Sequence, residues 1–236
     1  AGEQQQPAVL PECTQLLPLY SMALQKNVAF RGGTDVRTDE RANAMSQLAN
    51  MPVEHSRCFI YPRMFRLHDM EEDAGLPLES QDSTDDLLPT AGTDAIKLPA
   101  VANLSEERLS EDGIFLLENG VELYLWVGPS VSPALVLALF GIPSLEGQDL
   151  SSLQVQAEGN DLCRRVNTII SALREERMTY LKVIVVGKGD GQNERRFYWH
   201  LVEDRASFPG GSMNYAEYMM HISRHSAGGM GPSVGY

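Results

Sequence analysis

Apolar residues before residue 67 recur at intervals of three or four, which is the spacing of one face of a helix. A first helix is predicted to begin at Pro18, where the missing proline N–H costs nothing. A second helix is predicted to be capped by Thr38 and closed by Pro52, with a short third helix over 54–60. Four residues are predicted to share one face of the first helix: Leu19, Met22, Ala23 and Lys26. The predicted core-facing residues of the second helix are Ala42, Met45, Leu48 and Ala49. Residues 1–66 are therefore interpreted as the first part of a helical domain.

The pattern changes after residue 96, where alternating and wholly apolar runs replace the helical spacing. The Asn119-Gly120 pair predicts a tight hairpin turn between two strands. The predicted strands are 113–117, 121–127, 181–186 and 197–202, and the predicted helices are 131–140 and 161–174. The resulting order β-β-α-α-β-β predicts an α/β layer domain over 97–208.

A last helix is predicted within 209–226, after a Pro-Gly-Gly break. Its apolar face is formed by Tyr215, Tyr218, Met219 and Ile222. Residues 227–236 contain four glycines and no core pattern, and they predict a flexible tail. The whole pattern predicts an α+β protein, with a partial helical bundle and an α/β layer domain.

Charge is distributed unevenly along the 236 residues. The chain holds 32 acidic and 19 basic side chains, a net charge of −13. Nine of the acidic residues lie between Leu67 and Ile96, a window without Lys or Arg. High charge with few large apolar groups predicts a solvated linker or loop over 67–96. The spacing of an EF-hand calcium loop does not occur there, so a metal site is not predicted.

Composition also excludes several classes of protein. The acidic balance argues against a nucleic-acid binder, although Arg195 and Arg196 stand beside three aromatic residues. No run approaches the roughly 20 apolar residues of a membrane span, and no secretion signal is visible in the polar first residues. Three widely spaced cysteines predict free thiols in a reducing, cytoplasmic compartment.

Three features of the sequence are candidates for a catalytic or ligand-binding site. The glycine-rich loop 187–191 lacks the phosphate-loop pattern, and the strand predicted after it would offer no helix N-terminus to an anion. His221 and His225 lie four residues apart but lack the glutamate of zinc-protease motifs. Cys163 follows no catalytic pattern and is predicted to be an ordinary buried cysteine. The residues therefore predict no catalytic, cofactor-binding or metal site and no enzyme.

Six segments resemble, in the same order, the cargo-adaptor subunit family of the COPII vesicle coat. Two of them resemble its helical domain, three its gelsolin-like domain, and one its closing C-terminal helix. These segments are 16–31, 38–52, 111–128, 139–145, 167–186 and 201–222. The resemblance implies that the α/β layer domain is gelsolin-like and that the last helix packs back on the helical bundle.

The resemblance also implies a role. The family selects membrane cargo at the endoplasmic reticulum, so the chain is expected to be a non-catalytic part of a coat on the cytosolic side of that membrane and of its vesicles. The implied partners are the sister inner-coat subunit through upstream domains, the outer coat, and cargo or SNARE sorting signals, with peripheral membrane association. No cofactor is expected in this segment, whereas zinc is expected in the family's upstream zinc finger.

Two other interpretations stay open. The sister inner-coat subunit shares the architecture and stimulates the coat GTPase. An actin-binding gelsolin module would explain the α/β layer domain but would not explain the helices at both ends of the chain.

Overall fold

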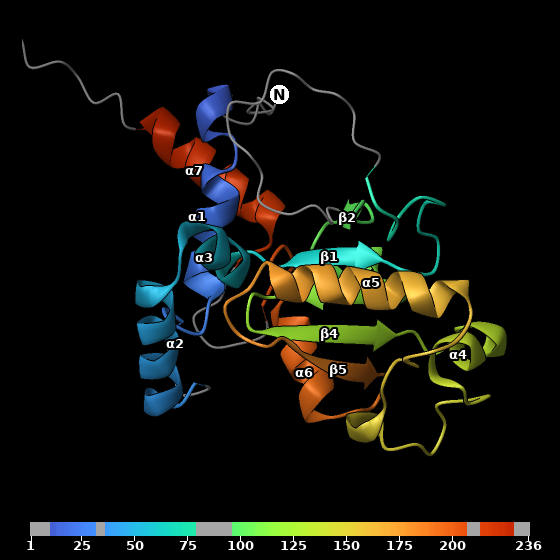
Figure 1. The fold of residues 1–236 in the computed structure, drawn as a ribbon. Helices are drawn as coiled ribbons and strands as arrows, with labels where there is room; N and C mark the ends of the chain where they lie inside the picture. The colour runs from blue at the N-terminus through green and yellow to red at the C-terminus, as the bar shows by residue number, and fades with distance from the viewer. Residues whose placement is uncertain (1–9, 32–35, 79–95, 207–212, 229–236) are drawn as a thin grey trace, which may run out of the picture. The chain divides into compact units, whose positions relative to one another are not determined.

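The computed structural model describes residues 10–31, 36–78, 96–206 and 213–228, without the side chains of 225–228 (Figure 1). The chain forms two compact units. The helical unit contains Ala1–Tyr61, Leu104–Glu106 and Trp199–Tyr236. The sheet unit contains Pro62–Asn103 and Glu107–Tyr198. The predicted boundaries at 66, 96 and 208 thus differ from the division that the backbone makes.

The helical unit is assembled from both ends of the chain. Its elements are η1 (Glu12–Thr14), α1 (Leu17–Lys26), α2 (Thr38–Asn50), α3 (Val53–Ile60) and α7 (Tyr215–Gly228). Pro18 lies in the first turn of α1, as predicted. Helix α7 packs beside α1, which Figure 1 shows in red and blue. The prediction that the last helix returns to the bundle is therefore confirmed.

The face predicted for α2 is wrong. Ala42, Met45 and Ala49 are exposed and Leu48 is half-buried, whereas the one buried residue of the helix is Ala44. Three of the four predicted positions are small or flexible side chains, which constrain the orientation of a helix weakly. Thr38 is also not the cap, because Arg37 precedes the helix there and no side chain bonds the first turn.

Lys26 is the central polar residue of the helical unit. Its side chain is only 4% exposed, and its Nζ donates hydrogen bonds to the carbonyl oxygens of Val202 and Asp204, both at 2.6 Å. The sequence placed Lys26 on the same face of α1 as Met22 and Ala23, and the structure buries all three and shows why a charged residue is stable there. An amine with two acceptors supplied by the backbone satisfies its own hydrogen bonds and those of the carbonyls. Burial lowers the pKa of Lys26 to about 8.

The carboxylates beside Lys26 complete the same junction. Glu203 Oε1 accepts hydrogen bonds from the Tyr61 hydroxyl at 2.6 Å and from the Leu104 amide at 2.9 Å. The Asp204 carboxylate accepts from Ser105 Oγ and from the Glu106 amide, both at 2.7 Å. Residues 202–204 therefore tie together α1, the end of α3 and the segment 104–106, which are far apart in the sequence.

The sheet unit is built on five strands in the order β2-β1-β3-β4-β5. They are β1 (Arg63–Arg66), β2 (Val101–Ala102), β3 (Ile114–Glu118), β4 (Glu122–Val127) and β5 (Lys182–Gly187). All neighbours pair antiparallel except β4 and β5, which are parallel. The three predicted strands over 113–127 and 181–186 are confirmed.

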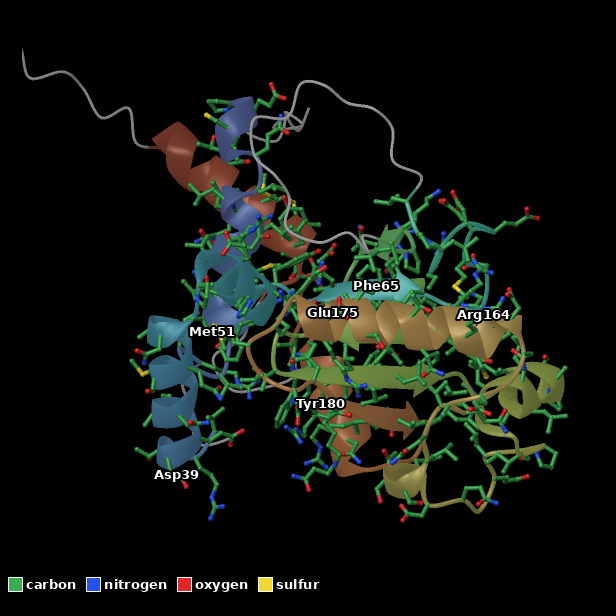
Figure 2. All side chains as sticks on the ribbon, viewed as in Figure 1. Asp39, Met51, Phe65, Arg164, Glu175 and Tyr180 are labelled. Atoms are coloured by element: carbon green, nitrogen blue, oxygen red, sulfur yellow. The ribbon has the colours of Figure 1, made fainter. Side chains whose placement is uncertain are left out.

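Two helices cross between the parallel strands and cover one face of the sheet. They are α4 (Pro133–Phe140) and α5 (Asp161–Glu175), separated by η3 (Leu150–Ser152). Ser132 caps α4 and Asn160 caps α5 through their side-chain oxygens. Figure 2 labels Phe65 on β1 beside α5, and it belongs to the main apolar core with Leu116, Leu125, Val166, Ile169 and Leu173.

The strand predicted over 197–202 does not exist. Residues Gln192–Trp199 form helix α6 instead. The apolar alternation was misleading because Phe197 is an inward-facing helical residue, stacked on Trp126 at a centroid distance of 6.2 Å. Its side chain is fully buried with Tyr124 on the face of the sheet that α4 and α5 leave free.

The acidic window was predicted to be a linker throughout, and its first part is packed. Leu67 and Ala74 are buried, and Arg165 Nε of α5 donates to the Ala74 carbonyl at 2.7 Å. Gly75 has φ +80°, and a Cβ at that position would lie 2.9 Å from the Arg165 carbonyl oxygen. Lys97, one residue beyond the window, binds Asp73 at 2.8 Å. Residues 79–95 lie outside the described part of the chain.

Strand β1 was also assigned to the wrong domain. Arg63–Arg66 was placed with the helical block, but it pairs with β3 in the interior of the sheet. A strand of four residues is too short for its alternation to be recognised, and its long-range pairing is not visible in the local pattern.

Replacing Lys26 by Ala should destabilise the helical unit. The substitution leaves two buried carbonyls without their donor, which costs about 2–4 kcal/mol of unfolding free energy. Urea unfolding followed by circular dichroism measures the loss. Lys188→Ala, which removes an exposed lysine, is the matched control and should change the midpoint little. Equal midpoints for the two variants would contradict the role given to Lys26.

The titration of Lys26 should also appear in the pH dependence of stability. The folded protein releases this proton near pH 8, whereas the unfolded chain keeps it up to the ordinary pKa of 10.5. Between these values the unfolded state binds more protons, so this group makes the unfolding free energy rise with pH. The neutral amine still donates to both carbonyls. We expect the stability difference between the unmodified chain and Lys26→Met to grow from pH 8 to 10; a flat difference would argue against the lowered pKa.

Candidate functional site

A pocket of about 510 Å³ lies at the carboxyl ends of the parallel strands β4 and β5. Its floor is formed where the strands end, at Gly128 and Gly187. Its walls are mostly apolar and come from the crossover: Pro129, Val131, Pro133, Val136, Pro143, Leu145 and Leu150. Crevices outside the carboxyl ends of parallel strands are the usual ligand sites of open α/β sheets. The position and size of the pocket make it the candidate site of the sheet unit.

The lining favours binding over catalysis. Its polar side chains are Ser144, Glu146 and Lys188, all exposed. The Glu146 amide donates a hydrogen bond to Ser144 Oγ at 3.1 Å, but within the described ranges no side chain of the three bonds the side chain of another, so no nucleophile–base pair is formed. The pocket thus offers an apolar surface with one positive and one negative group at its rim.

The glycine-rich loop beside the pocket differs from the prediction. Helix α6 follows it directly, so the helix N-terminus that the sequence analysis excluded is present. The amide of Gly189 donates to Glu194 Oε2 at 2.9 Å. A carboxylate of the chain itself therefore occupies this amide, and the loop is not a phosphate cradle.

The histidine pair gains no support from its surroundings. His221 is exposed on α7, and the side chain of His225 lies outside the described residues. In the part of the chain that the structure describes, no group of three or more His, Cys, Asp or Glu is placed to hold a metal ion.

Cys163 is an ordinary buried cysteine, as predicted. Its side chain is fully buried in the first turn of α5, and its Sγ donates to the Ala138 carbonyl at 2.6 Å. Burial raises the pKa of the Cys163 thiol. The neighbouring arginines face other partners, since Arg164 pairs with Asp161 and Arg165 with backbone carbonyls. None of the described contacts of Cys163 activates its thiol as a nucleophile.

The basic and aromatic residues near 195–199 serve the packing of the sheet unit. Phe197 is buried against Trp126, and Arg196 pairs with Glu122 at 3.1 Å. Glu122 also accepts a hydrogen bond from the buried Tyr124 hydroxyl at 2.8 Å, and burial raises the pKa of that tyrosine. Phe197 thus packs on the sheet from helix α6, and not within a strand as the sequence predicted.

The most deeply buried charge escaped the sequence analysis. Glu118 is inaccessible to solvent at the end of β3 and is held by Arg177 at 2.7 Å and Arg63 at 2.8 Å. Arg63 also binds Glu176 at 2.7 Å. The signal in the sequence was a glutamate that ends an apolar strand just before the Asn-Gly turn. Since each charge has an opposite partner, the cluster locks β1, β3 and the end of α5 and is structural.

Two protein-family models match different parts of the chain. The Sec23/Sec24 helical domain matches residues 1–58, and the gelsolin repeat matches residues 95–168. The chain is 35% identical to the human protein transport protein Sec24C over 217 residues, which is 92% of this chain and 18% of Sec24C. It is 30% identical to the Arabidopsis thaliana protein transport protein SEC24 B, again over 92% of this chain and 18% of the relative.

A solved structure agrees. The crystal structure of the human COPII-coat protein Sec24c superposes with a TM-score of 0.74 at 32% identity, covering 93% of this chain and 27% of that one. The predicted resemblance to the Sec24 family is confirmed. The α+β fold with helical and gelsolin-like parts is confirmed with it. The chain spans less than a fifth of the length of these Sec24 relatives. Among the described residues, no helix has both the length and the apolar character needed to cross a bilayer.

Thiol labelling tests the burial of Cys163. With iodoacetamide the exposed Cys13 should react quickly in the native chain, whereas the buried Cys163 should stay unmodified until urea opens α5. Mass spectrometry of tryptic peptides reports each site separately. Cys58, buried in the helical unit, serves as the internal control. Rapid labelling of Cys163 in the native chain would contradict the described packing.

Proposed function

We propose that this chain is a non-catalytic structural part of a COPII cargo-adaptor subunit. The observation that carries the proposal is the likeness to Sec24c over nearly the whole chain, with a helical domain and a gelsolin repeat in the same order. In that role the chain supports cargo selection and coat assembly in transport from the endoplasmic reticulum to the Golgi.

The geometry suits a rigid structural support better than a catalytic site. The helical unit is closed by residues from both ends of the chain through the Lys26 junction. The sheet unit is stiffened by the buried charges around Glu118. Buried pairs of this kind destabilise a fold strongly when one partner is lost, so they enforce one arrangement of the strands that they join. A rigid support is what an adaptor needs to hold cargo-reading domains in place.

The partners follow from the same proposal. We expect the protein that contains this chain to pair with the sister inner-coat subunit, to contact the outer coat, and to read sorting signals on cargo or SNARE proteins. It would act at the cytosolic side of the endoplasmic reticulum membrane and its vesicles through peripheral association, without nucleic acid. Zinc would belong to an upstream zinc finger.

The two alternative functions, a sister inner-coat subunit and an actin-binding gelsolin module, predict different similarities to known proteins. A sister-subunit role would favour relatives named Sec23, whereas the relatives reported above are named Sec24. An actin-binding gelsolin module would leave the helical unit without a purpose, and this unit matches the Sec23/Sec24 helical domain.

A chimera tests the proposal. Human Sec24C in which this chain replaces the matching 18% of the sequence should still bind human Sec23 and support vesicle budding from microsomes. The matched control is the same chimera without Tyr215–Gly228, in which the helical unit stays open; it should lose budding. A chimera that binds Sec23 but forms no vesicles would contradict the structural role. Calcium-dependent co-sedimentation of the chain with actin filaments would support the gelsolin alternative instead.

A further inference from the structure

One edge of the sheet unit combines a free strand with exposed apolar side chains. Strand β5 ends the strand order, so half of its backbone N–H and C=O groups point away from β4. Apart from the ladder to β4, the described backbone forms no hydrogen bond with Lys182, Val183 or Ile184. Natural sheets usually protect such an edge, and the opposite edge does so by its shortness, since β2 has two residues.

Within the described part of the chain, β5 is covered at its far end. Helix η3 packs beside it, and Leu150 approaches Gly187 so closely that a Cβ there would lie 3.0 Å from its side chain. Val185, Val186 and Gly187 are buried, whereas Lys182 is exposed. The accessible part of the edge is therefore its first half.

Two large apolar side chains stand at the entry to this half. Met178 is 83% exposed and Tyr180 is 74% exposed, the highest values among the large apolar residues of the described chain. Figure 2 labels Tyr180 near the start of β5. The Arg174 guanidinium lies 4.3 Å from the centre of its ring, and Arg174 Nε donates to the Leu181 carbonyl at 3.0 Å. The aromatic ring is thus held in place by an arginine that is itself bound to the backbone.

The charge of this edge is opposite to that of the chain. Residues 178–189 contain Lys182 and Lys188 and no acidic residue, in a chain of net charge −13. Lys182 and Lys188 bracket the strand, and neither forms an ion pair with a described residue. Aromatic, methionine and arginine side chains are the types enriched at protein interfaces.

We propose that the first half of β5 is a docking edge for an extended acidic segment of a partner protein. The segment adds a sixth strand, its backbone pairs with Lys182–Ile184, an apolar side chain packs on Tyr180 and Met178, and its carboxylates face Lys182. Main-chain pairing supplies affinity in this mode of recognition, and the side chains supply specificity. A second copy of the chain fits less well, because it carries the same lysines at this edge and offers no carboxylate there to face Lys182. The inference rests on the sheet unit alone and is independent of the coat role.

The probe is a fluorescein-labelled synthetic peptide in which valine and glutamate alternate, and its binding is followed by fluorescence polarisation. Tyr180→Ala and Lys182→Glu should each weaken binding about tenfold or more, because each removes one of the two side-chain contacts. Phe30→Ala removes an exposed aromatic residue of the helical unit and is the matched control; it should leave the affinity unchanged. All three residues are exposed, so the variants are expected to fold.

Two further peptides isolate the backbone and the charge. The same peptide methylated at alternate amide nitrogens should not bind, since it cannot pair with the strand, and a valine–lysine peptide should bind far more weakly. Hydrogen exchange should slow at Lys182–Ile184 when the valine–glutamate peptide is bound. Absence of binding, equal binding of the methylated peptide, or protection elsewhere would each overturn the proposal. Self-association of the free chain that Lys182→Glu abolishes would also overturn it, in favour of a second copy as the occupant.

Discussion

The parallel pairing of β4 with β5 is the constraint on which the sheet unit depends. Two parallel neighbours cannot be joined by a hairpin, so the chain must cross over one face of the sheet before it returns. That crossover supplies α4, η3 and α5, and the apolar sides of α4 and α5 pack on the strands to form the main core. It also leaves the carboxyl ends of both strands beside the crossover loops, where the pocket lies. Because the chain then turns into α6 instead of adding another strand, β5 remains an edge.

The helical unit has a different organising principle, since its parts come from three separate stretches of the chain. Helix packing brings α1 and α7 together, and the polar junction at residues 202–204 specifies how the stretches meet. Lys26, Tyr61 and the amides of Leu104 and Glu106 all find their acceptors there. Such a junction depends on every member, because each buried group left unpaired carries its full desolvation cost.

The uneven distribution of charge along the chain bears on both the fold and the proposed roles. The acidic residues that stand out in the sequence are partly neutralised in space, as Lys97 shows by binding Asp73 across the window's boundary. The hydrogen bond from Lys97 lowers the pKa of the Asp73 carboxyl. Lys182 and Lys188 along β5 form no ion pair with a described residue, which makes this edge the surface most suited to an acidic partner. A structural coat component with one selective edge would combine support with recognition.

The sequence by itself determined the elements whose signal is local. Four elements are predicted by the spacing of their own apolar residues or by their own turn residues. They are the first helix at Pro18, the hairpin at Asn119-Gly120, the amphipathic helix over 161–174 and the buried strand over 181–186. Six ordered segments were also sufficient to identify the resemblance to the coat adaptor family. The buried Cys163 followed from the absence of any catalytic pattern around it.

Only the tertiary structure decided the features that depend on distant neighbours. Strand β1 exists because β3 pairs with it, and the packing of 67–78 exists because α5 offers Arg165. The alternation at 197–202 resembled a strand until the sheet placed Trp126 beside Phe197 and favoured a helix. Lys26 and Glu118 are stable in the interior because carbonyls and arginines far away in the sequence reach them. The local sequence determines which conformations a segment prefers in isolation. Where two conformations are nearly equal in free energy, burial and hydrogen bonding between distant segments decide which one forms.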